Sequence, residues 1–187
     1  MSVDPVLPPP FGPPPKRAFR TLPDPPPRKK SEPTQALLTK PKFFIVHGHH
    51  RGARTEVELF VHQAKKTPVV LKDESQPGED LLDELAKKTE DVSFAIVIMT
   101  ADDVGASKEH PDVMRDRARQ NVVFEFGFLV HQLGKAKVFV LREEGVELPS
   151  DYLGVVYIPY DEHGVWKGLL AKAIKRAGLG IDVGAVI

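Results

Sequence analysis

A single carboxylate interrupts an apolar run in the second half of the chain. The stretch "NVVFEFGFLV", residues 121–130, contains Glu125 as its only charged residue. Apolar side chains recur there with helical spacing, at Val122, Phe126, Leu129, Val130 and Leu133. This stripe predicts a helix over about 119–133 with Glu125 on an adjacent face, one turn after Asn121. Arg119, just before the helix, is placed to hold a phosphate or the Glu125 carboxylate. The same pattern also fits a Glu125 that is only an ordinary exposed glutamate near a helix start, where the helix dipole favours an acid.

The segment "HGHHRG", residues 47–52, offers a different set of groups. Gly48 and Gly52 let the backbone come close to a ribose or a phosphate. Arg51 or Arg54 is suited to pair with a pyrophosphate. The spacing in "GHHRG" does not match G-x-G-x-x-G, so a dinucleotide cofactor bound in the Rossmann manner is disfavoured.

Three histidines in this segment, His47, His49 and His50, resemble a metal site at first sight. They could bind zinc only together with a carboxylate such as Asp102 or Asp103. These two acids follow a predicted strand, where they are also suited to cap the next segment or to hold a loop. We predict no metal at this site.

From residue 42 onward, short apolar runs alternate with helical patterns. Strands are predicted at 42–48, 68–72, 94–100, 137–141 and 154–160, helices at 53–66, 78–88, 119–133 and 166–177, and a polar loop at 101–117. Strands without polar alternation indicate a parallel sheet covered by helices on both faces. We therefore predict a flavodoxin-like α/β domain with a five-stranded parallel sheet. Its ligand crevice should lie at the carboxyl ends of the strands, beside "HGHHRG", "DES" and "TADDVG".

The first 41 residues differ from the rest in composition. They hold thirteen of the eighteen prolines, and seven Lys and Arg against three Asp and Glu give them a net charge of +4. Such a segment is predicted to be a disordered or polyproline-like basic tail. Its PxxPxR pattern, Pro23, Pro26 and Arg28, would suit an aromatic groove, but a solvated linker explains it as well. We divide the chain into this tail, a body over 42–180 and a C-terminal tail over 181–187.

Composition excludes several classes of function for the body. Nineteen Lys and Arg against twenty-three Asp and Glu outside the tail leave a net charge of −4, so we expect no DNA or RNA partner. The absence of cysteine excludes disulfides and thiolate chemistry. The longest apolar runs are far shorter than the roughly 20 residues of a membrane span, and no apolar signal core is present. We expect a cytoplasmic protein that does not contact a membrane.

Five blocks of the sequence together carry a family resemblance: "FFIVHGHHRGARTEVELFV", "FAIVIMTADDVGA", "RARQNVVFEFGFLVHQLGKAKVFVL", "GVELPSDYLGVVYIPYD" and "GVWKGLLAKAIKRAG". In order and spacing they resemble the bacterial TIR-like domain family, first described as predicted nucleotide-binding proteins. That family includes the TIR effectors of the CBASS and Pycsar anti-phage systems. The resemblance covers about residues 42–180 and implies the flavodoxin-like TIR fold.

The resemblance also implies an activity and a catalytic residue. Many members hydrolyse NAD to nicotinamide and ADP-ribose or a cyclic variant, so NAD would be a substrate and no cofactor is expected. The family's catalytic glutamate lies in an "NVxFExG" segment, which falls on Glu125. Substrate-binding roles are then assigned to the residues around the predicted crevice: His47, Gly48, His49, Arg51, Asp102, Arg119 and Asn121. Family effectors usually act with a sensor of a cyclic nucleotide or oligonucleotide, so a separate sensor protein and a homo-oligomeric active state are expected.

Two other functions remain open from the sequence. One is a TIR-like module that binds a nucleotide or scaffolds an assembly without turnover. The other is a related N-glycosidase or deoxyribosyltransferase acting on nucleotides. A response-regulator receiver is discounted because the loop after the first strand lacks paired acids.

Overall fold

The computed structural model describes residues 41–70, 81–149 and 154–186. Its strands are β1 (Lys42–Val46), β2 (Thr67–Val70), β3 (Val92–Met99), β4 (Asp103–Gly105), β5 (Arg115–Arg117), β6 (Val138–Arg142) and β7 (Val156–Pro159). Its α-helices are α1 (Arg51–Gln63), α2 (Leu81–Thr89), α3 (Gln120–Leu133) and α4 (Val165–Arg176). Two short 3₁₀ helices are η1 (Lys135–Lys137) and η2 (Val183–Ala185).

The main sheet has five strands in the order β2-β1-β3-β6-β7, and every pairing in it is parallel. β3 lies in the middle, and its residues are almost all buried because helices cover both faces of the sheet. The predicted five-stranded parallel sheet is therefore confirmed. All five strands end at one edge, so the loops that follow them share that edge.

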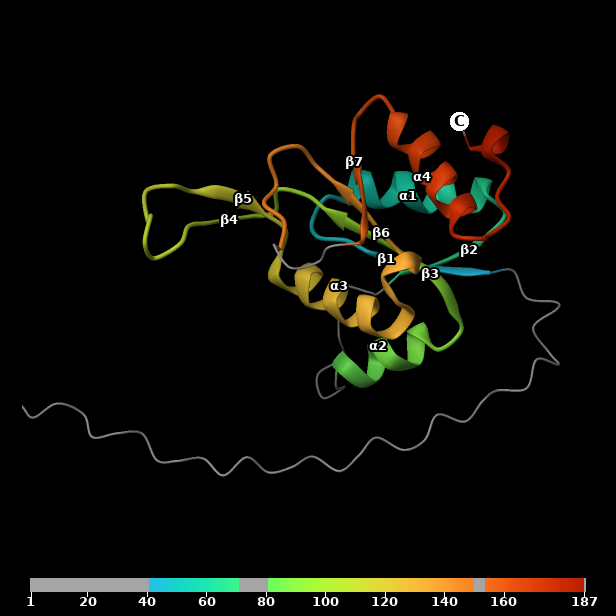
Figure 1. The fold of residues 1–187 in the computed structure, drawn as a ribbon, viewed down its shortest axis with the longest axis horizontal. Helices are drawn as coiled ribbons and strands as arrows, with labels where there is room; N and C mark the ends of the chain where they lie inside the picture. The colour runs from blue at the N-terminus through green and yellow to red at the C-terminus, as the bar shows by residue number, and fades with distance from the viewer. Residues whose placement is uncertain (1–40, 71–80, 150–153, 187) are drawn as a thin grey trace, which may run out of the picture. The chain divides into compact units, whose positions relative to one another are not determined.

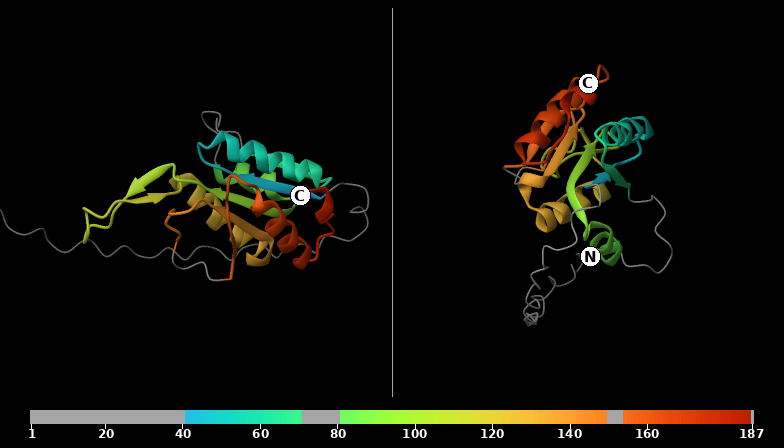
Figure 2. Two further views of the ribbon diagram at one scale, coloured as in Figure 1. Left: turned by 90° about the horizontal axis from the view of Figure 1, so that it is seen from above. Right: turned by 90° about the vertical axis from the view of Figure 1, so that its right-hand side faces the viewer.

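Two helices cover each face of the sheet (Figures 1 and 2). α1 and α4 pack with Phe43, Ile96 and Trp166 in one buried cluster. α2 and α3 pack with Phe44, Val97 and other residues in a second cluster on the opposite face. The alternation along each strand sends successive side chains to opposite clusters, as expected for a sheet buried on both faces. Trp166 is completely buried, which confirms that it packs the last helix onto the sheet.

The predicted polar loop over 101–117 is wrong. β4 and β5 pair antiparallel there and form a two-stranded ribbon that projects from the body (Figure 1). Glu147, far along the chain, receives ion pairs from Arg115 at 3.4 Å and from Arg117 at 2.6 Å. The Glu147 N–H also donates to the Asp116 carbonyl at 2.8 Å. These contacts between residues far apart in the sequence hold the base of the ribbon. A local pattern in the sequence cannot predict them.

The ends of two other segments differ from the predictions. α1 begins at Arg51 and not at residue 53, because the Nδ1 atom of His50 accepts the Ala53 N–H at 3.0 Å and caps the helix. The segment predicted as a C-terminal tail contains η2, and both Ile181 and Val186 are buried against the α1 and α4 cluster.

Some predictions fall outside the described residues. These are the basic tail over 1–40, the start of the second helix and the "DES" segment after β2. Among the helices of the described segments, none is long and apolar enough to cross a membrane.

Candidate active site

Among the residues that the structure describes, Glu125 is the one acid that is buried. It lies on α3 and is 7% exposed, beside the fully buried stripe of Val122, Phe126 and Leu129. The alternative of an ordinary exposed glutamate is therefore wrong. Glutamate is rarely buried in proteins, and α3 begins at the edge where open α/β sheets bind ligands, so Glu125 is a candidate functional group.

A cleft of about 930 Å³ lies on the other flank of α3. Its lining comes from the ribbon base, the start of α3 and the segment after β6: Ala101, Asp102, Asp103, Val104, Arg117, Ala118, Gln120, Val123, Glu147, Leu148 and Pro149. At 3.6 residues per turn, Val123 and Glu125 flank the buried stripe of α3 on opposite sides. Val123 lines this cleft, and Glu125 is not among its lining residues. The cleft and the predicted site residues therefore share Asp102.

The loop after β1 is held by internal hydrogen bonds. The His49 N–H donates to Oδ1 of Asp102 at 3.1 Å. The Thr100 hydroxyl donates to Oδ2 of the same carboxylate at 2.9 Å. The Nδ1 atom of His47 lies 2.7 Å from the Gly48 carbonyl, which accepts and so requires a proton on Nδ1. The Nε2 atom of His47 is buried with no hydrogen-bond partner among the described residues.

Each of the three histidines of this loop makes a different contact. His47 bonds within the loop, the backbone of His49 bonds to Asp102, and His50 caps α1. Within the described residues, no group of three or more His, Asp or Glu side chains is arranged to hold a metal ion.

The remaining predicted site residues lie near the same edge but are less constrained. Arg51 and Asn121 are exposed, and Arg119 is half-buried at the N-cap of α3 without a side-chain capping bond. Arg54, the other candidate for a pyrophosphate, pairs with Glu58 one turn along α1 at 2.6 Å. Arg51 and Arg119 are therefore better placed than Arg54 to meet an anionic substrate.

A polar group that the sequence did not predict lies on the α1 and α4 side of this edge. The Tyr160 hydroxyl donates to Glu56 at 3.3 Å, and its ring meets His50 edge-on at 6.3 Å between centroids. Burial, and then the charge of Glu56, raise the pKa of Tyr160 to about 12. Glu143 accepts the Ala101 N–H at 2.9 Å. Tyr160 and Glu143 each follow a strand, which is the signal that could have found them.

A parallel sheet of order β2-β1-β3-β6-β7 with helices on both faces places this chain in the flavodoxin-like class of α/β folds. Comparison with known proteins defines it further. The family described as "CAP12/Pycsar effector protein, TIR domain" matches residues 42–162. The chain belongs to this family, and the fold and the predicted resemblance are both confirmed.

Several known proteins are similar to this chain. The uncharacterized protein YuaY of Escherichia coli (strain K12) is 40% identical over 141 residues, which are 75% of this chain and 47% of YuaY. Protein tirC of Dictyostelium discoideum is 35% identical over 130 residues, 65% of each protein. The Pycsar effector protein BcPycTIR of Burkholderia cepacia is 39% identical over 83 residues, 42% of this chain and 26% of that effector. The aligned region thus spans about half to two thirds of the first two relatives.

Proposed function

We propose that this effector TIR domain hydrolyses NAD to nicotinamide and ADP-ribose or a cyclic variant, with Glu125 as the catalytic residue. The observation that carries the proposal is the burial of this one carboxylate on α3, near the strand ends. Membership of the CAP12/Pycsar effector family supports it.

The chemistry needs only one acid. Nicotinamide in NAD is a cationic leaving group, so the bond from its ring nitrogen to the ribose anomeric carbon breaks without a general acid. The electron pair of that bond leaves with nicotinamide, and positive charge develops on the ribose. A carboxylate held in a desolvated site stabilises that charge or forms a transient bond to the anomeric carbon. Water then adds to this carbon and releases a proton, or an internal hydroxyl adds and gives the cyclic product.

The other site residues have supporting roles in this proposal. The loop of His47, Gly48 and His49 forms one wall of the site, and Arg51 and Arg119 meet the pyrophosphate. The names of the Pycsar effector relatives support a role in anti-phage defence. We further propose that the active state is a homo-oligomer and that a separate sensor protein supplies the activating signal.

The test is nicotinamide release from NAD by the full chain at high concentration with a crowding agent. Glu125→Gln keeps the shape of the side chain but removes its charge, and we expect turnover to fall about 100-fold or more. Glu144→Gln is the matched control, because Glu144 is exposed and the chemical change is the same. Equal turnover by wild type and Glu125→Gln would refute the role of Glu125.

Product and binding measurements separate the rival functions. Transfer of the ribosyl group to a base, in place of hydrolysis, would identify the related N-glycosidase or deoxyribosyltransferase. NAD binding in a titration without any release would identify a binding or scaffolding module. If the protein neither binds NAD nor releases nicotinamide from it, the proposal is overturned.

A further inference from the structure

We infer that Asp102 is a positioning residue that locks the loop after β1, and that Gly48 is small because it makes room for this lock. The sequence left two roles open for Asp102, binding the substrate and holding a loop. Both oxygens of its carboxylate accept hydrogen bonds from groups of the protein, Oδ1 from the His49 N–H at 3.1 Å and Oδ2 from the Thr100 hydroxyl at 2.9 Å.

The lock joins two neighbouring strands where both have just ended. β1 and β3 pair in parallel, so the loops after Val46 and Met99 leave the sheet side by side. Thr100 is buried, and the Asp102 N–H donates to its carbonyl at 2.8 Å, which fixes the turn that carries the carboxylate. From this fixed turn, the Asp102 side chain reaches across to the backbone of the loop after β1. A substrate hydroxyl approaching this carboxylate would compete with bonds already made.

The position of Gly48 shows how closely the loop after β1 packs against the Asp102 side chain. A Cβ atom at this position would lie 1.8 Å from Oδ2 of Asp102 and 2.7 Å from its Cγ. Gly48 is not among the glycines with positive φ, so the requirement for glycine here is one of space and not of backbone conformation. The tip of a free side chain could swing away from a new methyl group. The carboxylate of Asp102 cannot do so without losing the bonds to His49 and Thr100.

The consequence is a loop whose shape depends on a residue from another strand. The His49 N–H donates a hydrogen bond to Asp102, and the next residue, His50, caps α1. Loss of the carboxylate would therefore release the wall of the Glu125 site and loosen the start of α1. The effect on turnover rests on the proposed NAD hydrolysis, whereas the lock itself does not.

The test is a double-mutant cycle in the full chain with Gly48→Ala, Asp102→Ala and the combined variant. Each substitution alone should lower the melting temperature, with a fall of about 3–10 °C for Gly48→Ala, where a methyl group is forced into an occupied space. In the Asp102→Ala background that space is empty, so Gly48→Ala should add almost nothing. Asp103→Ala is the control, since Asp103 is exposed and its combination with Gly48→Ala should be additive.

Turnover gives a second readout of the same cycle. Gly48→Ala should reduce nicotinamide release about tenfold to a hundredfold in the wild-type background, because the loop shifts, and less than twofold once Asp102 is Ala. Additive losses in melting temperature would overturn the lock. So would Asp102→Ala if it raised the KM for NAD and left the melting temperature unchanged, because that is the behaviour of a substrate ligand. Absence of turnover in the wild type would refute the proposed function but not the lock. The melting temperatures of the double-mutant cycle would still show whether Asp102 holds the loop after β1.

Discussion

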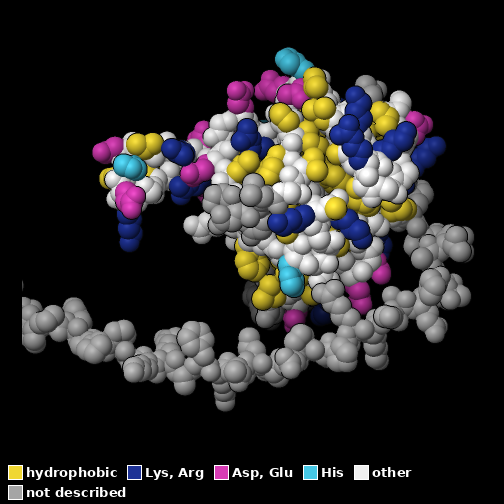
Figure 3. Space-filling model, viewed as in Figure 1, with side chains coloured by type: hydrophobic (Ala, Val, Ile, Leu, Met, Phe, Trp, Pro, Cys, Tyr) yellow, Lys and Arg dark blue, Asp and Glu magenta, His cyan; other side chains and the backbone are white. Residues whose placement is uncertain are grey.

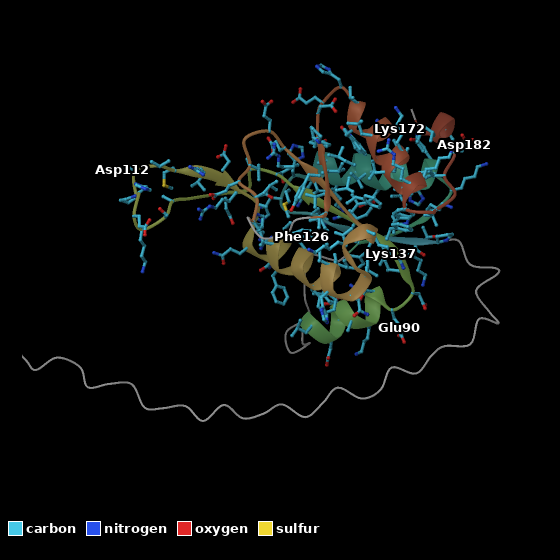
Figure 4. The ribbon with its side chains drawn as sticks, in the orientation of Figure 1. Glu90, Asp112, Phe126, Lys137, Lys172 and Asp182 are labelled. Carbon is cyan, nitrogen blue, oxygen red and sulfur yellow. The ribbon has the colours of Figure 1, made fainter. Side chains whose placement is uncertain are left out.

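Replacement of Phe126 by alanine tests the packing that buries Glu125. Phe126 lies on α3, directly after Glu125, and is fully buried in the cluster beneath α2 and α3 (Figure 4). Truncation of a buried phenylalanine to alanine removes apolar contacts and leaves a cavity, which costs about 3–5 kcal/mol of unfolding free energy. For a body of this size, this loss corresponds to a fall in melting temperature of roughly 10 °C.

Phe124→Ala is the matched control for this measurement. Phe124 lies on the same helix and undergoes the same chemical change, but it is 48% exposed, so we expect a loss of about 1 kcal/mol or less. Urea unfolding of the full chain can be followed by the fluorescence of Trp166, the single tryptophan. Trp166 is buried in the cluster on the opposite face of the sheet, so its signal reports global unfolding and not a local change at α3.

The comparison of the two variants decides the orientation of α3. A large loss for Phe126→Ala with a small one for Phe124→Ala agrees with a buried stripe that Glu125 flanks. Similar losses for both would refute the packing of α3, and the burial of Glu125 would lose its basis. The slope of the unfolding free energy against urea should stay unchanged, which shows that the variants differ in stability and not in compactness.

Two further measurements test the polar contacts around the strand ends. The folded pKa of Tyr160, about 12, lies above its ordinary value of 10.0, so the stability that this difference provides is present below pH 10 and is lost as the pH rises toward 12. The unfolding free energy of Tyr160→Phe should decline less over this interval than that of the wild type, and equal declines would contradict the assignment. Glu147→Ala removes both ion pairs of the ribbon, each worth about 0.2–1 kcal/mol at this exposure, so the melting temperature should change little. Trypsin cleavage after Arg115 and Arg117 should become several times faster in Glu147→Ala, and an unchanged rate would show that the ribbon does not depend on Glu147.

The projecting ribbon also shows why some features escape a sequence pattern. Its exposed residues are of every chemical type, with acidic, basic, histidine and hydrophobic side chains together (Figure 3), and Asp112 lies near its tip (Figure 4). In both β4 and β5 the first two residues are exposed and the third is half-buried, so neither strand shows the alternation that marks a half-buried strand. Pairing of β4 with β5 is stabilised by Glu147, a contact across 30 residues from Arg117.

The sequence alone determined the sheet, the helices and the identity of the candidate acid. Continuous apolar runs such as Phe43–Val46 can be buried only between two layers of helices, and the stripe of α3 has a helical period. Such patterns can be recognised locally, because the residues of each segment show by their own apolar spacing which of its faces is buried. The residues quoted for the family resemblance likewise pointed to Glu125 without any structure.

Only the tertiary structure decided which polar groups meet. Asp102 and His49 are 53 residues apart, and Tyr160 and Glu56 are 104 apart, so no spacing in the chain relates them. The burial of Glu125 was equally open, because a glutamate on the flank of an apolar stripe is covered or exposed according to what packs beside its helix. Hydrogen bonds and burial of this kind depend on where parallel strands place their carboxyl ends, and that placement exists only once the sheet has assembled.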